Sequence, residues 1–460
     1  MGDLDAAFER MRVIVSACYG SRGDVVPCLR LAEAFARLGA DVRVLANPMY
    51  ASEARNDLRF VGVGSAKAYE EMLKGNASRR GVRMLVRYWL SHLDEHTGKL
   101  IALCRERSGE NEEEDVVVLA HTLDFAVRCL EEHNERSNEF KTLRFYSIVL
   151  SPALLRGGTR RIPPYFAGAI VRFETQCGVL RRFAERFADW LVDSVFAPAL
   201  NSFRSRVYGI KTPVRGVFHR WFLTSNVLAM WPAYFEATTS MRVSPGFCRF
   251  LQVDFPSSDV SKDLSGDSTF RRAIEFVRRD SRPCVVFVSA SGNPPHAKVF
   301  FRLACRAMSR LTSMKAIMLT KHKDGIQKLI PENVKLFDFV PLTSLLAHSS
   351  MAVPTMAVHH ASMGCIAATV RAGVPSLIVP AVLDQHYNAD VLKEMGIVRV
   401  VKMSNLSRRL LVREIQATMT SESVAKCVAS VTKRANEDTR SAEERAASLI
   451  TKCSTTQIGF

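Results

Sequence analysis

The sequence lacks the features that define several protein classes. None of its apolar runs approaches the roughly 18 residues of a membrane-spanning helix. Its first residues, Met1-Gly2-Asp3-Leu4-Asp5, are acidic where a secretory signal peptide carries positive charge. Its 11 cysteines show no CxxC spacing, and their odd number argues against a disulfide framework or a zinc knuckle. We therefore expect a cytoplasmic protein in a reducing compartment.

An excess of acidic residues is also absent. The chain has 63 Lys and Arg against 46 Asp and Glu, a net charge of +17, which favours contact with phosphates and acidic membrane surfaces. No RNP-like aromatic pattern or other nucleic-acid motif accompanies this charge, so we expect no nucleic-acid partner. A length of 460 residues exceeds one ordinary core and predicts two domains.

Apolar runs of strand length alternate with helical patterns in both halves of the chain. Strands are expected at residues 12–17, 41–46, 116–120 and 144–150, and again at 284–289, 315–320, 334–340, 356–358 and 376–379. This alternation indicates an α/β protein with two doubly wound parallel sheets.

The domain boundaries follow from changes in composition. Residues 254–268 are rich in Ser and Asp and poor in apolar residues, as in a linker. We place an N-terminal domain at 1–255, a linker at 256–268 and a C-terminal domain with terminal helices at 269–460. We expect the final helix to cross back to the first domain.

A loop of small residues follows the first expected strand. It reads Tyr19-Gly20-Ser21-Arg22-Gly23-Asp24-Val25-Val26-Pro27, with the helix expected from Pro27, and ligands of open α/β sheets bind at this end of the strands. It lacks the third glycine of a dinucleotide fingerprint. Asp24 can cap the helix, or it can act as a general base toward an acceptor hydroxyl. The residues alone leave both interpretations open.

A second candidate site lies in the last third of the chain. His359-His360-Ala361-Ser362-Met363-Gly364-Cys365 indicates a strand end and a turn that opens a helix, and Asp384-Gln385 follows a later strand. Free N–H groups at a helix start bind phosphate, and a carboxylate beside an amide can hold sugar hydroxyls. Ser289, Ser291 and Gly292 form another turn, which suits either a phosphate or ordinary strand-to-helix geometry. The order of these features predicts a nucleotide-sugar site.

These motifs together resemble the inverting glycosyltransferases of the GT-B fold, in the branch of sterol glucosyltransferases and glycopeptide-antibiotic glycosyltransferases. The loop at 20–27 is similar to the Gly-Thr/Ser-Arg-Gly-Asp-Val-x-Pro loop of that branch, and Arg371-Ala372-Gly373-Val374-Pro375 matches another of its turns. Phe339-Val340-Pro341-Leu342 is similar to the segment whose backbone holds the nucleotide base. Ala361 and Ser362 stand where the family has glycines, and Cys365 stands where it has threonine.

The resemblance implies two Rossmann-like domains facing a cleft, with the acceptor on the first and the donor on the second. It implies Asp24 as the base. It places the donor among Ser289, Val340, His359, His360, Ser362, Met363, Gly364, Cys365, Asp384 and Gln385.

The implied reaction moves a hexose, expected to be glucose, from a UDP- or TDP-sugar to a hydroxyl of a lipid, sterol or other small hydrophobic acceptor. No metal and no tightly bound cofactor is expected. The altered residues of the donor loop leave an alternative open: an inactive GT-B protein that binds a nucleotide sugar or a protein partner.

One basic and aromatic stretch has two interpretations. Residues 156–220 hold twelve Lys or Arg against four acidic residues, with Phe183, Phe187 and Trp190 at helical spacing. Such a stretch can rest peripherally on an anionic membrane and collect a lipid acceptor. It can also be an amphipathic helix that packs on the core with its arginines in water.

Overall fold

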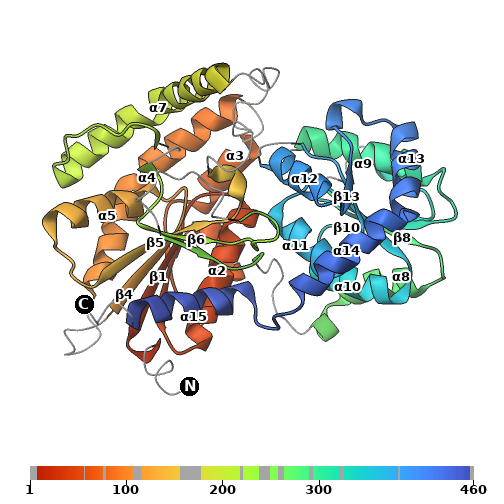
Figure 1. Ribbon diagram of the computed structural model, residues 1–460, viewed down its shortest axis with the longest axis horizontal. Helices are drawn as coiled ribbons and strands as arrows, with labels where there is room; N and C mark the ends of the chain where they lie inside the picture. Colours follow the sequence, from red (N-terminus) through yellow and green to blue (C-terminus); the bar gives the residue numbers. More distant parts are fainter. Residues whose placement is uncertain are drawn as a thin grey trace. The chain divides into compact units, whose positions relative to one another are not determined.

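The computed structural model describes residues 8–55, 57–75, 79–106, 115–155, 178–217, 221–237, 249–256, 264–289, 294–321, 323, 326–381 and 384–455. The chain divides into two compact units, one of Met1–Pro256 with Arg440–Phe460 and the other of Ser257–Thr439. Each unit is built around its own parallel sheet with helices on its faces (Figure 1). The predicted α/β class with two doubly wound sheets is confirmed.

The first unit has a seven-stranded sheet in the order β3-β2-β1-β4-β5-β6-β7, as far as the structure describes it. The strands are β1 (Met11–Ala17), β2 (Asp41–Ala46), β3 (Arg59–Gly62), β4 (Asp115–His121), β5 (Leu143–Val149), β6 (Asn226–Ala229) and β7 (Arg249–Gln252). Its main helices are α2 (Arg22–Arg37), α3 (Ala66–Gly75), α4 (Arg79–Arg105), α5 (Phe125–Ser137), α7 (Gly178–Tyr208) and α15 (Ala442–Thr455). Val13, Ile14 and Val15 are fully buried because β1 is central and covered on both faces.

Helix α2 begins at Arg22, earlier than the start at Pro27 that the sequence indicated. Ser21 is the N-cap residue, and Asp24 lies three residues later in the first turn. Asp24 Oδ2 accepts hydrogen bonds from the Ser21 N–H at 2.6 Å and from the Ser21 hydroxyl at 2.9 Å. A carboxylate at this position satisfies an N–H that the helix itself leaves free. Pro27 therefore lies inside the helix and does not start it.

The C-terminal helix α15 packs on α2 of the first unit. Ala447, Ile450 and Thr451 are fully buried there, and Arg445 forms a 2.6 Å ion pair with Asp254. Residues 440–460 are therefore part of the first unit, whereas the sequence analysis grouped all of 269–460 in one domain. Most of the expected linker, residues 257–263, lies outside the described residues.

The second unit has a six-stranded sheet, within the described residues, in the order β10-β9-β8-β11-β12-β13. Its strands are β8 (Cys284–Val288), β9 (Lys315–Leu319), β10 (Val334–Phe337), β11 (Thr355–His359), β12 (Ser376–Ile378) and β13 (Val398–Val400). The helices are α8 (Ser268–Arg278), α9 (Pro294–Met308), α10 (Leu342–Ala352), α11 (Met363–Arg371), α12 (Gln385–Glu394), α13 (Arg408–Met419) and α14 (Glu422–Ala435). All strand pairs are parallel, so their carboxyl ends lie at one edge.

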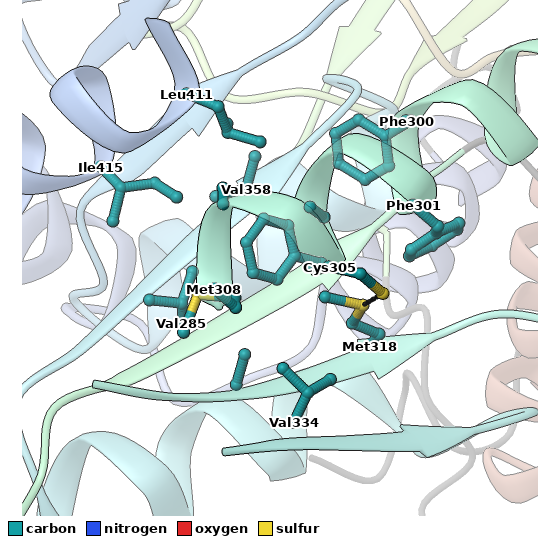
Figure 2. Packing of buried hydrophobic residues seen from close by; sticks show 14 of the residues in the cluster. Val285, Phe300, Phe301, Cys305, Met308, Met318, Val334, Val358, Leu411 and Ile415 are labelled. Carbon is teal, nitrogen blue, oxygen red and sulfur yellow. Dashed lines mark hydrogen bonds between the residues drawn. The ribbon is translucent and has the colours of Figure 1, made fainter. Parts of the chain in front are cut away.

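One core cluster of the second unit fixes α9 and α13 on the same face of the sheet (Figure 2). Phe301 and Met308 of α9 are buried with Leu411 and Ile415 of α13, and all of them pack against strand residues such as Val358. Burial of each large apolar side chain stabilises the fold by about 1.5–3 kcal/mol. The ends of these two helices are therefore held in fixed positions relative to each other.

Helix α7 is apolar on two different surfaces. Its later residues Leu200 and Phe203 are buried, whereas Phe187 and Trp190 are 44% and 61% exposed, with their rings stacked at 5.7 Å. Residues 156–177 and 218–220 of the basic stretch lie outside the described residues. The packed half of α7 fits the amphipathic-helix interpretation, and the exposed aromatic pair is not explained by it.

Candidate functional site

Asp24 lies at the carboxyl edge of the first sheet with one oxygen available. Oδ2 is used by Ser21, but Oδ1 lies 3.8 Å from His121 Nε2. The Asp24 side chain is 37% exposed and the His121 side chain only 2%. The two interpretations of Asp24 are compatible, because capping uses Oδ2 and leaves Oδ1 without a hydrogen bond among the described residues.

His121 is a neighbour of Asp24 that sequence reasoning missed. It ends β4, the strand next to β1 in the sheet. The Leu123 N–H donates to His121 Nδ1 at 3.4 Å, so the ring carries its proton on Nε2, which faces Asp24. Burial lowers the pKa of His121, while the Asp24 carboxylate acts in the opposite direction. The sequence could have indicated His121, because it lies at the carboxyl end of a strand expected in the same sheet as the strand before Asp24.

Gly20 is required by the close approach of this loop to Asp24. Its φ is +121°, and a Cβ there would lie 2.6 Å from the Asp24 Cβ. The Gly20 carbonyl accepts hydrogen bonds from the hydroxyls of Tyr69 and Tyr50, the latter at 3.5 Å. These contacts hold the backbone before Asp24 in place.

A buried polar network lies beneath this loop and was also missed. The Ser16 hydroxyl donates to Asp124 Oδ2 at 2.6 Å and lies 2.8 Å from His96 Nε2, and the Cys18 N–H donates to the same carboxylate oxygen at 3.1 Å. Burial raises the pKa of Asp124 to about 7 and lowers that of His96 to about 3. Asp124 and His96 come from residues more than 70 positions after Ser16, so no local pattern indicates the network.

The same network contains a set of metal-ligand types. Among the described residues, Cys18, His96 and Asp124 place one ligand atom each within 4.8 Å of the others. Ser16 and the Cys18 N–H already hydrogen-bond this set, and burial raises the pKa of the Cys18 thiol. A neutral thiol is a poor metal ligand, so the arrangement is that of a hydrogen-bond network.

In the second unit, the turn after β11 has an unusual backbone. Ala361 has φ +63°, a left-handed conformation that favours glycine. The Ala361 N–H donates to His359 Nδ1 at 3.2 Å, and its carbonyl accepts from Asn388 Nδ2 at 3.0 Å. Asn388 also contacts Asp384 Oδ2 at 3.1 Å. Asn388, another residue that sequence reasoning missed, therefore joins the histidine loop to the Asp384 segment.

Both histidines of the loop are buried and neutral at pH 7. Burial lowers the pKa of His359 to about 3 and that of His360 to about 4, and a hydrogen bond to the Val288 backbone acts in the opposite direction on His360. Within the described residues, His359 Nε2 and His360 Nδ1 have no hydrogen-bond partner. Buried polar atoms of native proteins are nearly always paired, so these two nitrogens are available for a ligand.

The helix start that follows is open for an anion. Ser362 is the N-cap of α11 but makes no side-chain cap bond, and Met363 to Cys365 form its first turn. Its N–H groups and helix dipole favour negative charge. Ser362 and Gly364 are partly exposed, whereas Met363 and Cys365 are buried.

The other residues that the sequence analysis expected to contact the donor lie after strands of the same sheet. Ser289 directly follows β8, which pairs with β11, and Gln385 Oε1 accepts from the Ala381 N–H at 3.0 Å. The Val340 side chain is buried in the core with Phe337 and Leu345, so only its main chain can contact a base. Ser291 and Gly292 lie outside the described residues.

The sequence is similar to one protein family and to individual proteins of known function. Residues 307–451 match the family described as "Erythromycin biosynthesis protein CIII-like, C-terminal domain". Enfumafungin synthase of Hormonema carpetanum is 25% identical over 46% of the chain, and the oleandomycin glycosyltransferase of Streptomyces antibioticus is 27% identical over 28% of it. The chain spans 15% of the length of the first relative and 29% of the second.

Solved structures match almost the whole chain. The structure of Medicago truncatula UGT71G1 complexed with UDP-glucose covers 99% of this chain and all of its own, at TM-score 0.62 and 12% identity. Glycosyltransferase VinC in complex with DTDP covers 97% of this chain and all of its own, at TM-score 0.60 and 18% identity. The chain therefore has the GT-B fold.

The match of the C-terminal region adds to the evidence from the fold. The resemblance to the GT-B glycosyltransferases is confirmed by the match of residues 307–451 to the EryCIII-like C-terminal domain together with the fold. The finer placement beside sterol and glycopeptide enzymes stays a prediction. No helix among the described residues has the length and apolarity needed to cross a membrane.

Proposed function

We propose that the chain is an inverting glycosyltransferase with Asp24 as the base. The observation that carries this proposal is the accessible Asp24 Oδ1 beside the buried His121. Oδ1 takes the proton of the acceptor hydroxyl while the acceptor oxygen bonds to the anomeric carbon. The bond from that carbon to the diphosphate breaks, and its electron pair leaves with the nucleoside diphosphate. His121 donates from Nε2 toward the carboxylate and orients it.

The donor is a UDP- or TDP-hexose bound by the second unit. The free N–H groups of α11 receive the diphosphate, and His360 assists by a hydrogen bond, not by charge, because its pKa is about 4. Asp384 and Gln385 hold sugar hydroxyls, Ser289 lines the site, and the Val340 main chain contacts the base. This class of donor is supported by two structural neighbours, one solved with UDP-glucose and the other with DTDP.

The acceptor is a lipid, a sterol or another small hydrophobic molecule with a hydroxyl group. The exposed Phe187 and Trp190 of α7 support a peripheral contact with an anionic membrane, from which such an acceptor can be collected. No metal ion is needed in this scheme, because α11 and the histidines receive the developing charge.

The Asp24→Asn variant tests the base. We expect transfer to fall by about 10²- to 10⁴-fold, measured as nucleoside diphosphate release with a panel of hydroxylated lipids and sterols. Calorimetric affinity for UDP-glucose or TDP-glucose should stay within twofold of the unmodified protein, and His360→Ala should weaken it. Asp267→Asn is the matched control, because Asp267 caps α8 by accepting from the N–H groups of Thr269 and Phe270.

Two other results have defined meanings. Normal turnover by Asp24→Asn would refute the base assignment. Tight nucleotide-sugar binding without turnover on any acceptor would favour the alternative, an inactive GT-B protein with Ala361, Ser362 and Cys365 as the cause.

A further inference from the structure

A basic cavity of about 650 Å³ opens in the second unit between the end of α9 and the start of α13. Its lining contains four arginines, two serines and two leucines, and no acidic residue: Leu303, Arg306, Ser309, Arg310, Leu406, Ser407, Arg408 and Arg409. A volume of this size accommodates a small-molecule ligand.

The packing of the two helices brings the arginines together. Arg306 lies in the last turn of α9, and Arg310 follows in the turn closed by its own N–H donating to the Ala307 carbonyl at 2.9 Å. Arg408 and Arg409 are the first two residues of α13. The core cluster of Figure 2 fixes both helices, so residues of both helices line one cavity as a consequence of the fold.

These four arginines are not neutralised by the protein. Within the described part of the chain, none of them has an acidic partner within 4.0 Å. Nearby arginines do have one: Arg399 and Arg413 both pair with Glu414, at 2.6 and 2.8 Å. Four like charges in one place repel each other, and a bound anion removes that repulsion.

The start of α13 adds to the attraction. Ser407 is the N-cap, and its hydroxyl accepts from the Leu410 N–H at 3.3 Å. The first N–H groups of this 12-residue helix have no partner within the helix, and its dipole places positive charge there.

The cavity is separate from the proposed donor site. Its lining contains none of the residues assigned to the donor, such as His360 and Ser289 at the carboxyl ends of β11 and β8. Arg306 and Arg310 lie near the end of α9, which leads into the amino end of β9.

We propose that this cavity binds an anion with two or more phosphate groups. Arginine binds phosphate oxygens in pairs of parallel hydrogen bonds, and four arginines match more than one phosphate. A soluble polyphosphate and the head group of a phosphoinositide share this chemistry.

The test compares two double variants of equal charge change. Arg306→Ala/Arg408→Ala removes one cavity arginine from each helix, and Arg271→Ala/Arg272→Ala removes two exposed arginines of α8. Calorimetry with inorganic tripolyphosphate measures the soluble ligand. Sedimentation with phosphatidylcholine vesicles containing phosphatidylinositol 4,5-bisphosphate measures the lipid, with phosphatidylserine vesicles of equal charge as the reference. Thermal unfolding checks that each variant is folded.

We expect the cavity variant to lose at least tenfold in affinity for tripolyphosphate, while the α8 variant loses less than twofold. Preferential sedimentation with the phosphoinositide vesicles, lost in the cavity variant, would identify a head group as the source, and binding of tripolyphosphate alone would identify a soluble anion. Equal losses in both double variants would mean non-specific charge attraction and would overturn the site. Absence of binding to both probes at millimolar concentration would overturn it as well.

Discussion

At the scale of single residues, Asp124 makes the stability of the first unit depend on pH. Its carboxyl is buried and its pKa is about 7, above the ordinary value of 3.8. The folded protein therefore holds a proton that the unfolded chain releases between pH 4 and 7. The stabilisation is fully present below pH 4 and is lost as the pH rises through 7. Each unit of pKa difference between the folded and unfolded states corresponds to about 1.4 kcal/mol, so the total loss is a few kcal/mol.

Asp124→Asn should remove this dependence, because a neutral amide can accept the same bonds from Ser16 and Cys18. We expect the variant to equal the unmodified protein in free energy of unfolding near pH 3 and to exceed it at pH 8.5. Urea unfolding at both pH values measures the difference. The buried histidines, whose lowered pKa values destabilise the fold in acid, are common to both proteins and cancel. A difference that is independent of pH would contradict the raised pKa.

Ala361 stores strain in the donor loop. Its φ of +63° costs an L-residue about 1–2 kcal/mol, and its side chain is fully buried. Ala361→Gly should leave the free energy of unfolding unchanged or raise it by up to about 1 kcal/mol, since strain relief offsets the lost methyl contact. Ala361→Val should lower it by about 2 kcal/mol or more, because β-branched residues tolerate this conformation poorly. Denaturant unfolding of the three proteins checks the order, and a valine variant as stable as the alanine protein would refute the strain.

The sequence indicated the unusual backbone at position 361, but it did not indicate which residues surround the candidate site residues. The resemblance drew attention to Ala361 as a departure from glycine, and the structure places it at a positive φ. The dual role of Asp24 could not be predicted, because it depends on which oxygen faces Ser21 and which faces His121. His121 and Asn388 were missed because each is distant in the chain from the residue it contacts.

At the scale of elements, charge counts along α7 were misleading. Arg204 and Arg206 contributed to the expected positive excess, but they pair with Glu132 and Asp94, which lie outside that stretch. Contacts between distant segments cannot be read from local composition. The central strands were predicted, because a strand buried on both faces needs a continuous apolar run, which is a local signal. The short strands β3, β6, β7 and β13 were missed.

The two surfaces of α7 predict opposite mutational effects. Leu200→Ala should lower the free energy of unfolding by about 2–5 kcal/mol, since Leu200 is fully buried. Phe187→Ser with Trp190→Ser should change it by less than about 1 kcal/mol but reduce sedimentation with vesicles of phosphatidylcholine and phosphatidylserine.

Val207→Ser is the control for this experiment, because Val207 is an exposed apolar residue at the other end of α7. Undiminished vesicle binding by the Phe187 and Trp190 variant would refute a membrane contact at this helix.

At the scale of the whole molecule, the chain's two units do not correspond to two continuous segments. The sequence analysis expected terminal helices and expected the last one to cross back to the first domain, but it did not indicate which surface that helix contacts. That surface is visible only in the fold, where α15 covers α2. The helix joins the first unit through its row of small side chains, Ala442, Ala446 and Ala447, with Ile450 as the largest buried group.

Removal of residues 440–460 should therefore destabilise the first unit and leave the second intact. The deletion exposes the apolar side of α2, breaks the ion pair between Arg445 and Asp254, and removes Thr451 from its contact with Met11 of β1. Hydrogen exchange should show lost protection in β1 and α2, with β8 and β9 unchanged, because stability is distributed over separate cooperative regions.

Ile450→Ala should produce the same pattern at a cost of about 2–5 kcal/mol, whereas Lys452→Ala, an exposed position on the same helix, should have little effect. Equal loss of protection in both sheets would show that the two units unfold together and that α15 stabilises the entire chain.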